Sequence, residues 1–117
     1  MIKHKIINNF IILPFVLTLF KKDRHAFNQL KFNYLYEQFF DQLIEQVQKD
    51  IIANKQLMYS KYKINVQLVE RTTKTWRYKI YENSHGRIIE FTPNELKEMT
   101  ITSMNDYLLK KKGVLTS

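Results

Sequence analysis

The chain has 117 residues and is strongly basic, with 19 lysines and arginines, 11 acidic residues and a net charge of +8. Its length fits a single domain over residues 1–117, and its apolar content of 44% favours a globular fold over disorder. It contains no cysteine, which excludes disulfides, thiolate catalysis and sulfur-ligated metals. The same absence is typical of a reducing compartment, so we expect a cytoplasmic or organelle-matrix protein.

The positive charge has two explanations. Nucleic acid is the commonest partner of a basic protein. However, the chain is rich in Ile, Lys, Asn, Phe and Tyr and poor in Gly, Ala and Pro. An AT-rich genome produces this composition, because the codons of the enriched amino acids are rich in A and T. Lysine outnumbers arginine 15 to 4, and bidentate contacts to phosphate or guanine rely mainly on arginine. The charge therefore favours nucleic acid only in part.

The first predicted element covers residues 1–22 and is mostly apolar over residues 6–20. Three interpretations stay open for it: a core strand or short helix, a membrane-associated segment, and a signal peptide. The apolar run is shorter than a membrane-spanning helix and has Pro14 in its middle, and no small-residue cleavage site follows. A core element is favoured, and as a strand it would carry Pro14 at an edge or a bulge.

The second predicted element is a long helix over residues 24–58. Asp23 can cap its start, and apolar side chains recur along one face at helical spacing. This stripe consists of Phe27, Leu30, Tyr34, Leu35, Phe39, Phe40, Leu43, Ile44, Val47 and Ile51. A helix of about 50 Å is long for a small domain. We therefore expect either a break near Asn54 or an overhang that meets a partner.

Residues 63–91 change to a two-residue rhythm, which predicts a three-stranded antiparallel sheet. The strands are expected at residues 61–71, 74–82 and 87–91, with Gly86 free to take a positive φ in the second turn. The apolar residues of one sheet face are Ile64, Val66, Leu68, Trp76, Tyr78 and Ile80. The sequence thus predicts one apolar face and one polar, cationic face.

The polar face is the candidate binding surface. Its predicted nucleic-acid-binding residues are Lys63, Arg71, Arg77, Lys79, Tyr81 and Arg87. The basic groups would offset phosphate charge, and Tyr81 would stack on a base. Two alternatives remain: a sheet face that is simply solvated, and a surface that contacts an acidic protein.

The last predicted element is a helix over residues 93–112. Thr92 and Glu95 form the pattern of a capping box, and Pro93 suits the first helical position. Gly113 is expected to end the helix. Its buried face is predicted to contain Leu96, Met99, Met104, Tyr107 and Leu108.

No catalytic pattern is visible in the sequence. The three histidines, His4, His25 and His85, lack the spacing of metal ligands, and two glycines cannot form a phosphate-binding loop. No serine lies in a glycine-flanked nucleophile turn. We therefore expect a protein that is not an enzyme and that has no catalytic residues, metal or cofactor.

Together these patterns predict an α+β fold in which the N-terminal element and both helices cover the apolar side of the sheet. The function expected first is non-catalytic binding of nucleic acid or a ribonucleoprotein through the polar face. The first alternative is a protein–protein interaction module or inhibitor from a mobile element or organelle. Such a protein could form homo- or hetero-oligomers through the long helix. The second alternative is a small membrane-associated protein.

Overall fold

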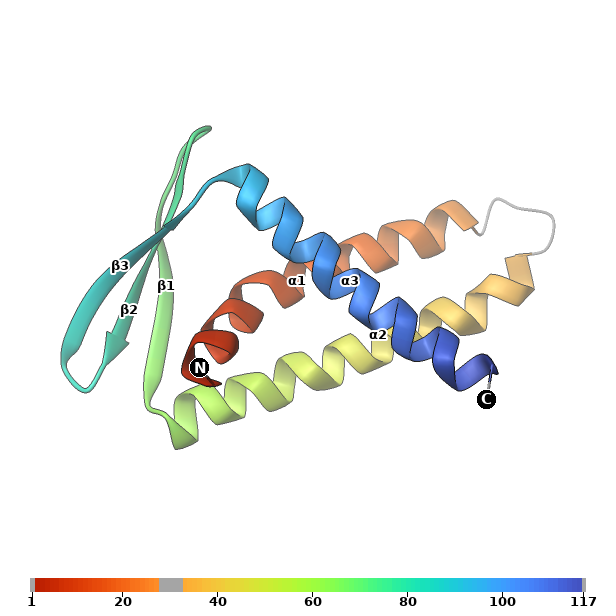
Figure 1. Cartoon of the computed structure of the whole chain (residues 1–117), viewed down its shortest axis with the longest axis horizontal. Coiled ribbons are helices and arrows are strands. Elements are labelled where there is room, and N and C mark those ends of the chain that lie inside the picture. The colour runs from red at the N-terminus through yellow and green to blue at the C-terminus, as the bar shows by residue number, and fades with distance from the viewer. Residues whose placement is uncertain (1, 28–32, 117) are drawn as a thin grey trace.

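The protein, here in a computed structural model that describes residues 2–27 and 33–116, has three helices and one sheet. The helices are α1 (Ile2–Phe27), α2 (Asn33–Gln56) and α3 (Pro93–Thr116), and a π-helical turn, η1 (Leu57–Lys61), continues α2. The strands are β1 (Ile64–Arg71), β2 (Trp76–Glu82) and β3 (His85–Phe91). They form an antiparallel sheet in the order β1-β2-β3. In Figure 1, α1 and α2 run in opposite directions, α3 crosses them, and the sheet lies at one end of the helices. The predicted α+β class is confirmed.

The apolar N-terminal element is a helix that packs on the core. The buried residues of α1 are Ile6, Ile7, Ile11, Ile12, Leu13, Val16 and Phe20. Their spacing places them along one face of a helix. Pro14 lies on the exposed side of α1, where Thr18 Oγ1 donates a hydrogen bond to the Pro14 carbonyl at 3.0 Å. The prediction of a core element is confirmed, whereas the strand interpretation of Pro14 is wrong.

By length and composition, α1 would also be able to cross a membrane over Ile2–Ala26. Of its apolar window, 33% is buried inside the protein. Core helices of soluble proteins and signal sequences share these properties, so membrane association stays a prediction.

The helix predicted over residues 24–58 is divided between two elements. Its first four residues belong to α1, and Asp23, the expected cap, lies inside α1. Two ion pairs then connect the end of α1 to α2. Arg24 Nε lies 2.7 Å from Asp41 Oδ1, and Arg24 Nη2 lies 3.1 Å from Glu37 Oε1. Local periodicity continued through this region, so the sequence did not reveal that two helices meet here.

The apolar stripe of α2 packs against α1 rather than against the sheet. Phe40, Leu43 and Val47 are buried in one cluster with Val16 and Phe20 of α1. The partly buried residues around this cluster include Phe39, Ile44 and Ile51 of the predicted stripe. Leu30 and the side chains of Phe27, Tyr34 and Leu35 lie outside the described part of the chain. Among the described residues, the stripe of the predicted long helix thus covers α1, and Met58 at its end packs with the sheet.

A second cluster joins the sheet to the N-terminal half of α1. Its members are Ile6, Ile7, Ile11, Ile12, Met58, Ile64, Val66, Tyr78, Ile80 and Leu96. Leu96 comes from α3, so α1 and α3 cover the apolar side of the sheet, while η1 adds Met58. The two clusters follow one another along α1, and the protein is accordingly long and flat, with extents of 53 × 33 × 18 Å.

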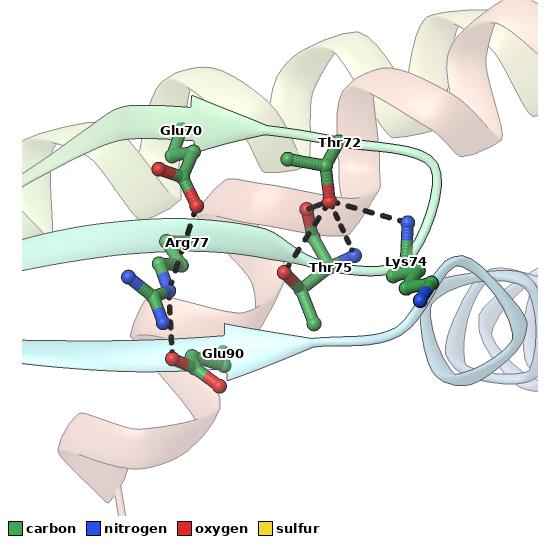
Figure 2. Close-up of polar contacts among 6 residues, drawn as sticks. All are labelled: Glu70, Thr72, Lys74, Thr75, Arg77 and Glu90. Carbon is green, nitrogen blue, oxygen red and sulfur yellow. Dashed lines mark hydrogen bonds and ion pairs between the residues drawn. The ribbon is translucent and has the colours of Figure 1, made fainter.

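The strand and helix ends differ from the predicted ones for local reasons. β1 begins at Ile64 because η1 occupies Leu57–Lys61. β2 begins at Trp76 because Thr72 and Thr75 close a turn in which Thr72 N donates to the Thr75 carbonyl at 2.8 Å. The Thr72 hydroxyl also accepts from the backbone N–H groups of Lys74 and Thr75 (Figure 2). β3 begins at His85, two residues early, and α3 continues past Gly113 to Thr116.

Candidate binding surfaces

The outer face of the sheet is the side that points away from α1, and it corresponds to the predicted polar face. The strand register gives its residues as Asn65, Gln67, Glu70, Arg77, Lys79, Tyr81, Gly86, Ile88 and Glu90. This set contains two cations and two carboxylates. The outer face is therefore polar, but it carries no net positive charge.

Arg77 is held by the two carboxylates of the outer face. Arg77 Nε lies 2.7 Å from Glu90 Oε1 and 3.7 Å from Glu70 Oε1. Figure 2 shows the arginine on the central strand between an acid on each neighbouring strand, and the register places both acids opposite it. A phosphate would have to compete with these carboxylates for the guanidinium.

Arg71 lies on the other face of the sheet because β1 contains a bulge. The register shifts between Leu68 and Glu70, so that Val69 is an extra residue and Arg71 pairs with Trp76. Arg71 Cζ lies 5.2 Å from the centre of the Trp76 ring, which is cation–π geometry. An extra residue reverses the alternation of all later residues in the strand. The predicted place of Arg71 on the polar face is therefore wrong.

The remaining predicted site residues divide between different positions. Arg87 is opposite Ile80 in the register, which puts it on the apolar face, although it is exposed. Lys63 precedes β1 and has a φ of 54°, so strand alternation does not apply to it. Only Arg77, Lys79 and Tyr81 share the outer face. Their predicted contact with nucleic acid stays a prediction.

Lys79 and Tyr81 form a second cation–π pair, with Lys79 Nζ 5.0 Å from the centre of the Tyr81 ring. Gly86 lies opposite Tyr81, and a Cβ at Gly86 would approach Lys79 Cε to 3.1 Å. Because Gly86 has no side chain, Lys79 and Tyr81 have room to stack beside it. Gly86 is free to take a positive φ but does not adopt one. Asn83 and Ser84 adopt φ of 51° and 70° instead, as a two-residue hairpin loop requires.

An apolar groove of about 310 Å³ lies between α1, β2 and α3, and we name it the Trp76 groove. It is lined by Phe15, Thr18, Leu19, Trp76, Pro93, Leu96, Lys97 and Thr100. Phe15 contacts Trp76 edge to face, with ring centres 5.7 Å apart. Lys97 is the charged residue of the lining, and Arg71 lies over the Trp76 ring. The groove is therefore apolar inside and positively charged at its border.

The capping box at the start of α3 positions one wall of the Trp76 groove. Glu95 N donates to Thr92 Oγ1 at 3.1 Å, and Thr92 N donates to Glu95 Oε1 at 3.0 Å. These reciprocal bonds confirm the predicted cap and fix the helix that carries Pro93, Leu96 and Lys97. The groove itself was not predicted, because the alternation of β2 places Trp76 on the apolar face and a sequence does not show a gap between helices.

A polar cleft of about 320 Å³ lies between the three helices. Tyr107 Oη donates a hydrogen bond to Asp50 Oδ2 at its edge, with an oxygen–oxygen distance of 2.5 Å. Burial, the hydrogen bond to Asp50 and the charge of Asp50 raise the pKa of Tyr107 well above its usual value.

Within residues 2–27 and 33–116, no group of three or more His, Asp or Glu side chains could hold a metal ion.

Comparison with known proteins gives a family match. Residues 2–112 match a family model described as YhjD protein. No curated protein and no solved structure matches the chain.

Proposed function

The chain belongs to the YhjD protein family, and because this membership names no ligand, we propose a function from the geometry: non-catalytic docking of a protein partner. The proposed site is the Trp76 groove, and the proposed ligand is an acidic, amphipathic segment of the partner. The observation that carries the proposal is an apolar groove with Lys97 in its lining and Arg71 stacked on its tryptophan.

The residue types in the groove are those that dominate protein–protein contacts. Tryptophan and arginine are enriched among interface residues whose truncation costs most binding energy. Apolar area that a ligand covers contributes about 25 cal/mol per Å², so aliphatic or aromatic side chains would supply the affinity. Carboxylates beside them would meet Lys97 and Arg71, which contributes to specificity and to the rate of association.

The outer face of the sheet supports this function less well. Its two cations are balanced by Glu70 and Glu90, so it lacks the electrostatic attraction that recruits a polyanion. By contrast, the ion pairs of the described residues include neither Lys97 nor Arg71, so both cations are available to an acidic ligand.

Trp76 is the single tryptophan of the chain, so its fluorescence reports directly on the groove. The probes are a designed amphipathic peptide with acidic flanking residues and a twin with the same apolar residues and lysine flanks. The acidic peptide is expected to change the Trp76 emission when it binds. Lys97→Glu is expected to weaken the binding of this peptide at least about tenfold, or 1.4 kcal/mol.

Lys55→Glu is the matched control, because Lys55 is an exposed lysine on α2 outside the groove lining. It should leave the affinity of the acidic peptide unchanged. Equal binding of the acidic and basic peptides, or equal loss in Lys97→Glu and Lys55→Glu, would rule out the proposed function.

A second candidate function is nucleic-acid binding, which the Lys79–Tyr81 pair favours. Tyr81 is 38% exposed and would offer a stacking surface, and Lys79 lies directly over it. Lys63, Lys79 and Arg87 also have no ion pair among the described residues. We expect the protein to retain mixed RNA and DNA on a filter at low salt. Lys79→Glu should abolish this retention, and added salt should reduce it steeply. No retention at low salt would exclude this candidate.

A further inference from the structure

The two edges of the sheet differ in their protection against pairing with another strand. Proteins protect free edges with charged side chains (above all lysine), inward-pointing charges, proline, bulges or an early end to the strand. β1 has a bulge between Leu68 and Glu70 and follows Lys63, which has a positive φ. β3 pairs with β2 at seven successive positions without a shift, and it contains no lysine or proline. β3 is therefore the more regular edge, without lysine, proline or a bulge, and its protection consists of the charges of Arg87 and Glu90.

The outward side of β3 is also free within the described protein. Backbone hydrogen bonds outside the helices and the sheet ladder do not involve β3 among the described residues. In Figure 1, the first half of β3 lies at the far left of the molecule, away from the helices. Ile88, in the middle of β3, is 49% exposed on the outer face. The unpaired backbone groups of β3 need either water or another strand as a partner.

We propose that two copies of this chain associate through β3, in antiparallel orientation centred on Ile88, and so form a continuous six-stranded sheet. A two-fold axis perpendicular to the sheet generates this pairing. Ile88 then lies opposite its own counterpart, Arg87 lies opposite Ile89, and Gly86 lies opposite Glu90. No two like charges are directly opposite, and two exposed isoleucines cover each other.

The accessible surface of the protein is larger than that of a compact monomer, which is consistent with an interface to a second copy. The accessible surface is 8279 Å². A compact monomer of 14.2 kDa exposes about 6,800 Å², which leaves an excess of about 1,500 Å². A standard interface takes roughly 800 Å² from each partner. The radius of gyration of 16.3 Å likewise exceeds the roughly 13 Å of a compact chain of this length.

The response to salt distinguishes dimerisation through β3 from binding of a ligand in the Trp76 groove. Each copy carries a charge of +8, so the two copies repel each other at long range. The dimer is therefore expected to strengthen as salt is added, whereas binding of an acidic ligand in the groove weakens. Neither result depends on the other, so failure of one proposal leaves the other intact.

Substitution at the two-fold axis tests the register. Ile88→Lys places two lysines opposite each other and beside Lys79, which pairs with residue 88 in the register. Sedimentation velocity in about 0.5 M salt is expected to show at least a tenfold loss in the association constant, or about 1.4 kcal/mol. Mixing Ile88→Lys with Ile88→Glu should restore a mixed dimer, detected by native mass spectrometry. Only a site that faces itself predicts this rescue.

Ile52→Lys provides the control, since Ile52 is exposed on α2 and is not part of the sheet. It should dimerise like the unchanged protein, and circular dichroism should show the same fold for all variants. Amide exchange in β3 should slow at concentrations where the dimer forms. A monomer at all concentrations up to about 0.5 mM, absence of the mixed dimer, or equal disruption by Ile52→Lys would overturn the proposal.

Discussion

The ion pair between Arg77 and Glu90 can be measured with a double-mutant cycle of Arg77→Met, Glu90→Gln and the double variant. Both side chains are about half exposed, with 47% and 48% of their areas accessible, so solvent screens the pair. Exposed pairs contribute about 0.2–1 kcal/mol, and the 2.7 Å contact between Arg77 Nε and Glu90 Oε1 favours the upper half of that range. We expect a coupling free energy of about 0.5–1 kcal/mol at low salt.

Thermal and urea unfolding give the stabilities for this cycle. Unfolding entropy is about 2.1 cal/mol/K per residue, so a loss of about 1 kcal/mol lowers the Tm of this 117-residue chain by roughly 4 °C. Arg77→Met should show a change near this value, because it also loses the 3.7 Å contact with Glu70.

Salt supplies the control for the Arg77–Glu90 cycle. In about 1 M salt the Debye length is roughly 3 Å, so the coupling should fall well below its low-salt value. A coupling near zero at low salt would mean that Arg77 is free to bind other anions. The inference that Glu70 and Glu90 compete with a phosphate for Arg77 would then be refuted.

The remaining predictions concern the cap of α3, the half-buried Tyr107 and a contact between helices. Thr92→Ala removes half of the capping box and should cost about 1 kcal/mol in thermal unfolding, whereas Thr73→Ala in the exposed hairpin turn should cost little. The folded-state pKa of Tyr107 is raised above its usual value of 10.0. The stability that the neutral Tyr107 hydroxyl contributes is therefore fully present below pH 10.0 and is lost as the pH rises through the folded-state pKa. Tyr107→Phe should therefore flatten the alkaline loss of stability, and its ultraviolet titration should lack the tyrosine that ionises last; an unchanged titration would contradict this assignment. Asn54 Nδ2 donates a buried hydrogen bond to the Ile6 carbonyl at 2.9 Å, so Asn54→Ala should cost about 1–2 kcal/mol in urea unfolding; a loss within error would show that this contact adds nothing.

The features that the sequence predicted correctly depend on short stretches of chain. The two-residue rhythm of residues 63–91 yields the three strands, and the pattern from Thr92 to Glu95 yields the capping box with both of its hydrogen bonds. Apolar spacing also indicated a buried N-terminal element. Each of these signals comes from neighbours within a few residues, which is why one sequence suffices to recognise them.

The composition of the binding surfaces depends on register and packing, which no short pattern contains. Val69 gives no sign that it is an extra residue, yet it moves Arg71 onto Trp76. The pairing of Glu70 and Glu90 with Arg77 requires the strand register, so the predicted cationic face proved to be neutral. The Trp76 groove requires the relative positions of α1 and α3, which are far apart in the chain.

The position of α1 between two clusters has a consequence for folding during synthesis. α1 leaves the ribosome before the residues that cover it, which come from α2, the sheet and, last, Leu96 of α3. Val16 and Phe20 can pack on α2 early, but Ile6, Ile7, Ile11 and Ile12 lack their native contacts until the sheet and Leu96 have been made. Contacts this distant in sequence slow folding, and the waiting helix is the segment of the nascent chain that a chaperone would recognise.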